Sequence, residues 1–246
     1  MSSSPISILS QTDFNGDPLD EELLQRTFRQ LMDEHGYVLM CNVPDSFDQV
    51  KFCRGLGGFV PNYTGAVVGD VRPEPGMDDV YHAGNTRPLT PHSEGYDFTV
   101  LPPRYIALWC VTPASGPGGE TTLADTAPWV AELDEREREL LEGTEFEWKT
   151  TEGVNRLGLD LHTKHPVLEQ HADGMIVRFS CNNLVRADDD EVVPLQERWK
   201  ENFYRDQISI DYHPNDMLVW DNWRLLHARN AFSDRSRHLR RIQIAN

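Results

Sequence analysis

The sequence has 246 residues, with 40 Asp and Glu against 23 Lys and Arg, so its formal net charge is −17. This acidic balance argues against nucleic acids and anionic membrane surfaces as partners, because each of them needs a positively charged face. The longest apolar stretch, Tyr105–Val111, has seven residues, far fewer than the roughly 20 that a transmembrane helix requires.

The N-terminal segment and the cysteines indicate the cell compartment. No Lys or Arg precedes Arg26 and no long apolar segment follows the first methionine, so we expect no signal peptide. The four cysteines, at positions 41, 53, 110 and 181, lack the spacing of a zinc site. We therefore expect free thiols and a cytoplasmic protein. The length and the 39% hydrophobic content predict one domain covering residues 1–246.

The first part of the chain predicts one helix, one strand and a long loop. Residues 18–35 have helical periodicity, with Asp17 as the N-cap and Gly36 at the end. Residues 37–43 follow as a strand. Residues 55–90 are rich in Gly and Pro and predict a loop, and a loop of this length in a compact domain usually serves function.

The second half of the chain is rich in strand-like segments. The expected strands are residues 105–111, 120–124, 175–179, 208–212, 217–220 and 239–244. Two helical segments interrupt them, residues 128–142 and 194–204. Many short strands with few helices predict a mainly β fold with flanking helices, a β-sandwich or jelly roll and not a parallel α/β sheet.

His92 and Glu94 form the first of two patches that indicate chemistry. Residues two apart on a strand project from the same side, so this imidazole and this carboxylate could hold one metal ion. His227, from a later strand, could supply a third ligand. Two histidines and one carboxylate on one face of a metal leave three positions open, which suits Fe(II) that binds oxygen and a bidentate cosubstrate. Taken alone, the short H-x-E triplet is more simply a hydrogen-bonded structural pair.

The second patch is a run of arginines around His227. Six arginines lie between positions 224 and 241 of an otherwise acidic chain. They form either a solvated basic face or a buried anion site. The second is possible because a guanidinium can donate two parallel hydrogen bonds to one carboxylate. Arg237 and Arg241 lie on one strand-like run four residues apart, so both should point to the same side. Arg229 is a further candidate for an inward-facing cation.

Four motifs, in this order, resemble the taurine dioxygenase and clavaminate synthase-like family. They are His92-x-Glu94, Gly118-Gly119-Glu120-Thr121, Asp221-Asn222 followed by His227-Ala228-Arg229, and Arg237-His238-Leu239-Arg240-Arg241. The resemblance extends over nearly the whole chain. Members of this family are Fe(II)- and 2-oxoglutarate-dependent oxygenases that use O2. The resemblance therefore implies a dioxygenase with a double-stranded β-helix, or jelly-roll, core.

The resemblance also implies roles for individual residues. His92, Glu94 and His227 match the metal ligands. Thr121 matches the hydroxyl donor to 2-oxoglutarate, and Arg237 matches the partner of its distal carboxylate. The carboxylate ligand is Glu where many relatives have Asp, which resembles the branch of the family that acts on amino acids.

Four residues are candidates for contact with the substrate. Arg241 matches a second pocket arginine that in relatives lies near an anionic group, and Arg229, Asn85 and Asn182 join it, although the asparagines could instead bond within turns. We expect a small anionic or zwitterionic substrate, an amino acid or related carboxylic acid. The expected reaction oxidises an unactivated C–H bond by hydroxylation, desaturation or cyclisation, with release of succinate and CO2.

Three other functions would use a similar set of residues. A zinc hydrolase needs two histidines, a glutamate and a water, but it gives no role to the arginines or to the Gly-Gly-x-Thr motif. A metal-silent jelly-roll binding protein would hold no iron. A halogenase needs the carboxylate position vacant for halide, and Glu94 fills it. The oxygenase is therefore the main prediction.

Overall fold

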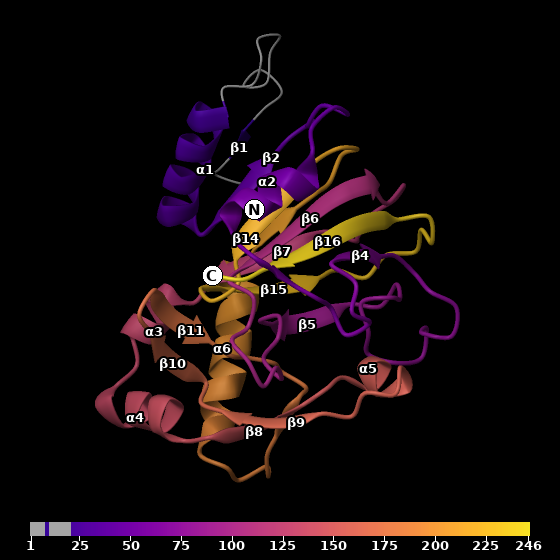
Figure 1. The fold of residues 1–246 in the computed structure, drawn as a ribbon. Helices are drawn as coiled ribbons and strands as arrows, with labels where there is room; N and C mark the ends of the chain where they lie inside the picture. The colour runs from indigo at the N-terminus through magenta and orange to yellow at the C-terminus, as the bar shows by residue number, and fades with distance from the viewer. Residues whose placement is uncertain (1–7, 10–20) are drawn as a thin grey trace.

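The computed structural model describes residues 8–9 and 21–246 (Figure 1). Asp17 and Pro18, expected at the start of the first helix, lie outside the described residues. Helix α1 (Glu21–His35) ends, as predicted, at Gly36, whose φ is 75°. A positive φ suits glycine at a helix end because it has no Cβ to clash.

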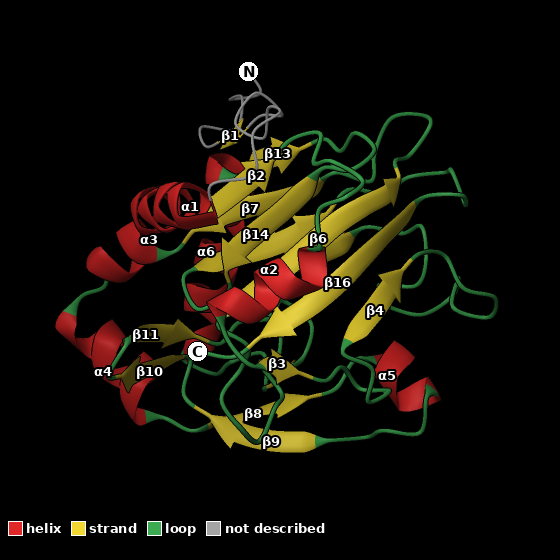
Figure 2. Ribbon diagram, turned by 45° about the horizontal axis from the view of Figure 1, so that its top comes forward, coloured by secondary structure: helices red, strands yellow, loops and turns green. Residues whose placement is uncertain are grey.

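A large sheet forms the centre of the molecule. In spatial order its strands are β1 (Ile8–Leu9), β2 (Tyr37–Met40), β14 (Met217–Asp221), β6 (Tyr105–Thr112), β16 (His238–Ile244) and β3 (Phe59–Val60), and β4 (Val68–Val71) also pairs with β16. β1 runs parallel to β2, and the other described pairs are antiparallel. Helices α1 and α2 (Gln49–Leu56) cover one face of this sheet and share a hydrophobic core with it (Figure 2).

A smaller antiparallel sheet packs on the opposite face. Its strands, in spatial order, are β13 (Ile208–Ile210), β7 (Thr121–Asp125), β15 (Leu225–Arg229) and β5 (Leu89–His92). The two sheets meet in one buried cluster, which Leu39, Leu218 and Trp220 enter from the large sheet and Leu123 and Leu225 from the small one. Alternate residues of a strand face opposite sides, so each sheet contributes one face to this shared layer.

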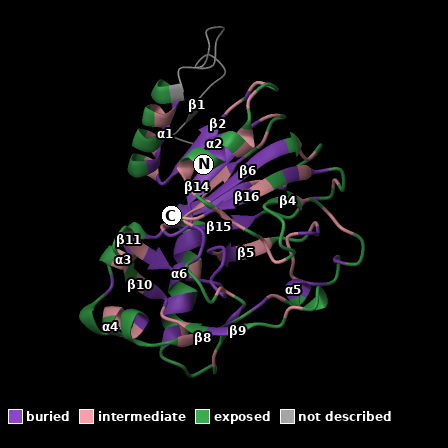
Figure 3. Cartoon of the chain, viewed as in Figure 1, coloured by how far each residue is buried: buried purple, intermediate pink, exposed green. Residues whose placement is uncertain are grey.

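A third group of elements adds a second core behind the small sheet. It consists of α3 (Ala127–Ala131), α4 (Glu135–Gly143), β8 (Phe146–Lys149), α5 (Glu152–Arg156), β9 (His162–His165), β10 (Leu168–His171), β11 (Gly174–Val177), β12 (Leu184–Val185) and α6 (Val192–Asp206). Trp148, Trp199 and Phe203 pack in this core together with Leu226 and Ala228 of β15. β15 is therefore buried on both faces, and in Figure 3 the central strands are mostly buried while α1 and α4 expose their outer sides.

The mainly β, antiparallel fold with flanking helices agrees with the sequence prediction, and the differences have local causes. The expected helix 128–142 is two helices, because Asp134 starts α4 with a capping box formed with Glu137. The expected loop 55–90 contains β3 and β4. β4 was missed because it includes Gly69 and Asp70, two residue types that are typical of turns. Helices α2 and α5 and strands β1, β8 to β10 and β12 were not predicted.

Two sequence-based expectations about the whole chain can be checked directly. Within the described residues, no helix is long and apolar enough to cross a membrane. The four cysteines, all in the described part of the chain, are free thiols.

The contact between the sheets predicts a large effect of Leu218→Ala. Leu218 is fully buried between the sheets, so this change should lower the free energy of unfolding by about 2–5 kcal/mol. The control Leu157→Ala changes an exposed leucine and should cost less than about 0.5 kcal/mol. Urea denaturation measures both, and equal midpoints for the two variants would contradict this packing.

Candidate metal centre and substrate pocket

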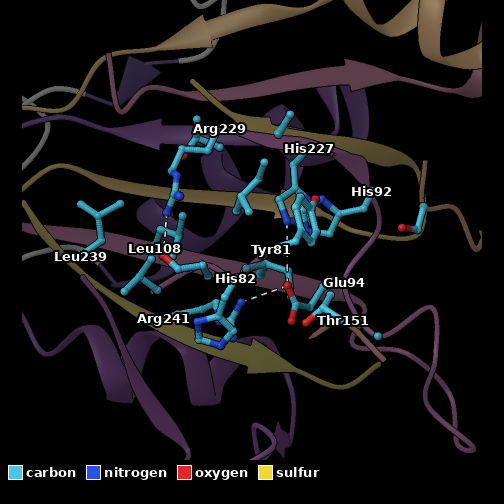
Figure 4. A pocket seen from close by; sticks show the side chains of 18 of the residues that line it. Tyr81, His82, His92, Glu94, Leu108, Thr151, His227, Arg229, Leu239 and Arg241 are labelled. Atoms are coloured by element: carbon cyan, nitrogen blue, oxygen red, sulfur yellow. Dashed lines mark hydrogen bonds and ion pairs between the residues drawn. The ribbon is translucent and has the colours of Figure 1, made fainter. Parts of the chain in front are cut away.

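A cavity of about 120 Å³ lies between the two sheets (Figure 4). Both sheets and the loop before β5 contribute to its lining. His92, Glu94 and His227 cluster on one side of the cavity, while Arg229 and Leu239 lie on the other. The residues predicted to bind a metal and those predicted to bind anions therefore face one space.

His92, Glu94 and His227, the predicted metal ligands, come together beside this cavity. β5 and β15 pair with His92 opposite His227, and the two ring centroids are 4.1 Å apart. Oε2 of Glu94 lies 3.9 Å from Nε2 of His227. One nitrogen or oxygen atom from each residue lies within 4.8 Å of the others, close enough for three atoms to bind one ion.

Glu94 reaches this position by a different route from the expected one. β5 ends at His92, so Glu94 lies in the following turn and strand alternation does not orient it. Instead Asn222 holds its backbone: Oδ1 accepts from the Glu94 N–H at 2.7 Å, and Nδ2 donates to the Glu94 carbonyl at 2.9 Å. The turn between β14 and β15 thus fixes the loop that carries the carboxylate.

Burial prepares both imidazoles to act as ligands, and a hydrogen bond also orients His92. Nδ1 of His92 donates to the Thr90 carbonyl at 2.8 Å, which leaves Nε2 with its lone pair. Burial lowers the pKa of His92 and His227 below the ordinary histidine value, because desolvation disfavours the charged ring. Neutral imidazoles and a carboxylate are the forms that bind a metal, and this donor set fits a facial Fe(II) site.

Two residues of β16 bind the Glu94 carboxylate. Nη1 of Arg241 donates to Oε2 at 3.0 Å, and Nε2 of Gln243 donates to Oε1 at 2.9 Å. Arg241 lines the cavity, as expected of a substrate contact. Its charge nevertheless has a protein carboxylate as partner, so burial of Arg241 does not by itself require a substrate anion.

Comparison with known protein families identifies this chain. The family model described as taurine catabolism dioxygenase TauD, TfdA family matches residues 4–243. The chain belongs to the TauD/TfdA family. This membership confirms the family that the sequence motifs predicted.

Individual relatives of this TauD/TfdA-family chain are distant. The 3-((Z)-2-isocyanoethenyl)-1H-indole synthase of Fischerella ambigua is 29% identical over 60% of this chain and 60% of its own length. The tyrosine isonitrile desaturase of Pseudomonas aeruginosa is 27% identical over 81% of this chain and 73% of its own. The chain thus matches only 60% of the first relative's length.

Solved structures agree on the fold. Asparagine oxygenase in complex with Fe(II), 2S,3S-3-hydroxyasparagine and succinate superposes with a TM-score of 0.75 at 19% identity, covering 91% of this chain and 79% of that one. PvcB, an Fe, alpha-ketoglutarate dependent oxygenase from an isonitrile synthetic pathway, gives a TM-score of 0.63 at 20% identity, covering 96% and 82%.

In this TauD/TfdA-family chain, the residues expected to hold 2-oxoglutarate line the same cavity as the metal trio. Arg237 is 2% exposed, and its Nη2 donates to the Gly119 carbonyl at 2.7 Å. Nη1 is buried and finds no hydrogen-bond partner in the described part of the chain. Thr121 also lines the cavity, with its hydroxyl 2.9 Å from that of Tyr212. A buried guanidinium with an unused donor fits a carboxylate ligand.

Close packing of the backbone explains the first glycine of the Gly-Gly-x-Thr motif. Gly118 has a φ of 92°, and a Cβ at this position would overlap the carbonyl oxygen of Ala231. Only glycine lets the chain before β7 pass this close to the segment after β15. Thr121, three residues after Gly118, lines the cavity together with Arg237.

Alternation along the run from Arg237 into β16 agrees with the expected register. Arg237, Leu239 and Arg241 all line the cavity. Arg240 instead points away, with a half-exposed side chain 3.8 Å from Asp70. The geometry therefore favours Arg237 over Arg240 as the arginine that faces a ligand.

Arg229 of β15 forms a buried hydrogen-bond network with Asn85 and other residues of the loop 72–88, which we call the cover loop. Arg229 lines the cavity but donates to the carbonyls of Ala83 and Arg87, both at 2.6 Å, and to Oδ1 of Asn85 at 3.1 Å. No carboxylate among the described residues forms an ion pair with it, and burial lowers its pKa to about 9. Both residues therefore hold the cover loop, and Asn85 does not line the cavity.

The cavity lining differs from the expected substrate contacts in Asn182 and in two residues that were not predicted. Asn182 lies outside the described cavity lining and donates to Oγ1 of Thr90 at 3.0 Å. Sequence reasoning missed Tyr63 and His82, which do line the cavity. The Tyr63 hydroxyl donates to the buried Asp97 carboxylate at 2.7 Å. Both missed residues lie in Gly- and Pro-rich loops without periodicity, so their only signal was the unusual length of that segment.

The network around Arg229 predicts that Arg229→Met loosens the cover loop. Each charge-assisted hydrogen bond contributes about 1.5–3 kcal/mol, so the loop should open at least about tenfold more often. Limited digestion with endoproteinase Asp-N, which can cut before the exposed Asp78 and Asp79 of this loop, measures this opening. The control Arg240→Met should digest like the wild type, and a wild-type rate for Arg229→Met would show that the loop does not depend on this network.

Proposed function

We propose that this protein is a dioxygenase that uses Fe(II), 2-oxoglutarate and O2 to oxidise an unactivated C–H bond of a small amino acid or related carboxylic acid, with release of succinate and CO2. The observation that carries the proposal is the His92, Glu94 and His227 trio, whose donor atoms lie within 4.8 Å of one another beside the cavity. We assign residues 1–246 to one oxygenase domain, which the family match over residues 4–243 supports.

We infer further that the two sheets form a double-stranded β-helix. Along the chain, β4, β6, β14 and β16 belong to the large sheet, and β5, β7, β13 and β15 belong to the small one. The chain therefore alternates between the sheets, with one double step from β7 to β13, as two interleaved jelly-roll halves would. Free cysteines in this fold support a reducing compartment, and we propose the cytoplasm.

Different residues of the chain would bind the metal and the cosubstrate. Bound Fe(II) supplies the activation of oxygen, with 2-oxoglutarate as the electron donor. His92, Glu94 and His227 would hold the ion on one face. Arg237 would pair with the distal carboxylate of 2-oxoglutarate, and the Thr121 hydroxyl would donate to it. The surrounding protein positions the substrate and excludes water, which removes much of the entropic barrier.

Several observations support an anionic or zwitterionic substrate. Arginines line the cavity although the chain as a whole has a charge of −17. The Arg241 side chain keeps 20% of its surface exposed while it donates to Glu94, so it can also reach a ligand. Neighbouring structures are described as holding hydroxyasparagine or (3S)-hydroxy-L-Arg. We therefore assign Arg241 to the substrate carboxylate.

The metal site predicts the effect of losing either histidine. His92→Ala and His227→Ala should each abolish turnover and reduce Fe(II) affinity by more than about tenfold, because two ligands hold an ion poorly. His162→Ala, a half-exposed histidine paired with Glu147, is the matched control. Anaerobic Fe(II) titration and succinate formation measure the two effects. Near-normal activity of either ligand variant would refute the assignment.

The cosubstrate site predicts a loss of affinity in Arg237→Met. Removing one partner of a buried charge pair costs about 2–5 kcal/mol, so the apparent KM for 2-oxoglutarate should rise about thirtyfold or more. Arg240→Met should leave it unchanged, because Arg240 points away from the cavity. The opposite pattern would mean that Arg240, and not Arg237, binds the cosubstrate.

The substrate class is tested by screening free amino acids and small acids for stimulated succinate formation with added Fe(II). Product mass separates gain of oxygen from loss of two hydrogens. The wild type should prefer an active acid over its carboxamide by at least about tenfold, as one charge-assisted hydrogen bond implies. Arg241→Gln should lose this preference and Arg241→Lys should keep part of it. Equal turnover of acid and amide by the wild type would exclude a carboxylate contact.

A further inference from the structure

Gln243 is a buried polar residue whose side-chain amide is only half satisfied. Its side chain is 1% exposed, and Nε2 donates to Oε1 of Glu94 at 2.9 Å. Its own carbonyl oxygen is buried and has no hydrogen-bond partner among the described residues. An unsatisfied buried acceptor destabilises a fold, and leucine, of similar size, would avoid that cost. The polarity of Gln243 therefore serves Glu94.

The two oxygens of Glu94 have different surroundings. Oε2 lies 3.9 Å from Nε2 of His227 and accepts from Arg241. Oε1 accepts from Gln243. Both oxygens thus accept from β16, and Oε2 is the one that lies near His227.

With the backbone of Glu94 fixed, its carboxylate can still rotate about the terminal side-chain torsion. Asn222 holds the peptide groups of Glu94 on both sides. The terminal torsion of a glutamate is broad and has no sharp preference of its own, so the carboxylate could still turn both oxygens toward a metal. A donor on Oε1, placed on a central strand between β6 and β3, opposes that rotation.

We propose that Gln243 is a positioning residue that keeps Glu94 bound to Fe(II) through Oε2 alone. The proposal rests on the function proposed above. A facial triad of single donor atoms leaves three positions, two for the keto-acid end of 2-oxoglutarate and one for O2. A Glu94 bound through both oxygens would occupy one of the three. Gln243 does not line the cavity, so it acts through Glu94 and not on a ligand.

The test compares Gln243→Leu with Gln196→Leu. Gln196 is also buried, but both ends of its amide are bonded, to the Ser180 carbonyl and to Arg186. Binding of 2-oxoglutarate to Fe(II)-loaded protein is followed without oxygen, by the visible charge-transfer band that a chelating keto acid gives with Fe(II). Thermal unfolding of the metal-free proteins is the second readout.

The proposal predicts opposite effects for the two variants. Gln243→Leu should bind 2-oxoglutarate about 10–100-fold more weakly, as is usual when the partner of a metal ligand is lost. It should unfold near the wild-type temperature, because it removes the unsatisfied oxygen of Gln243 but leaves Oε1 of Glu94 without its donor. Gln196→Leu should unfold at a lower temperature and bind 2-oxoglutarate normally. Gln243→Asn, whose shorter amide withdraws the donor, should weaken 2-oxoglutarate binding in the same way and decides the question if Gln243→Leu fails to fold.

Two results would overturn the inference. One is wild-type affinity for 2-oxoglutarate in both Gln243 variants. The other is a loss of affinity accompanied by a fall in unfolding temperature as large as that of Gln196→Leu, which would mean a purely structural role. If the wild type itself gives no band with Fe(II) and 2-oxoglutarate, the proposed function fails, and that outcome is separate from a band that the variants leave unchanged.

Discussion

Hydrogen bonds to the Glu94 carboxylate join the two sheets across the cavity. Glu94 follows β5 of the small sheet, yet its oxygens accept from Arg241 and Gln243 on β16 of the large sheet, and its backbone is held by Asn222 between β14 and β15. A buried carboxylate is costly unless its charge and its lone pairs are satisfied. Three segments that are distant in sequence must therefore pack in register before this one group is stable, so the metal trio is a product of the closed fold.

Strand alternation made much of this arrangement predictable. Along the strand-like run from Arg237 to Ile244, period two places Arg237 and Arg241 on one side and Arg240 on the other. In the structure the first two line the cavity and Arg240 is half exposed. His92 and His227 were each expected on a strand, and the structure adds that these two strands pair with the histidines opposite each other. The side of a strand to which a residue points depends on local geometry alone, so it can be predicted from the sequence.

Residues outside regular elements could not be placed in this way. Asn85 and Arg229 have the chemistry of substrate contacts, but the folded cover loop supplies carbonyls that take up their donors. Asn222 belonged to a noted motif, yet its partner is a turn 128 residues away in sequence. A polar side chain bonds to the nearest suitable group in the folded chain, and periodicity carries no information about which loop that is.

The contrast between the arginine-lined cavity and the acidic exterior bears on how ligands arrive. A dianion that approaches this protein first meets a net charge of −17 and is repelled, and only within the cavity does it meet Arg237 and Arg241. The outer charges are screened over about 10 Å at 0.1 M salt, whereas the buried ones are screened much less. Added salt should therefore speed the capture of small dianions here, in contrast to enzymes whose surface charge attracts the substrate and whose association rates fall with ionic strength.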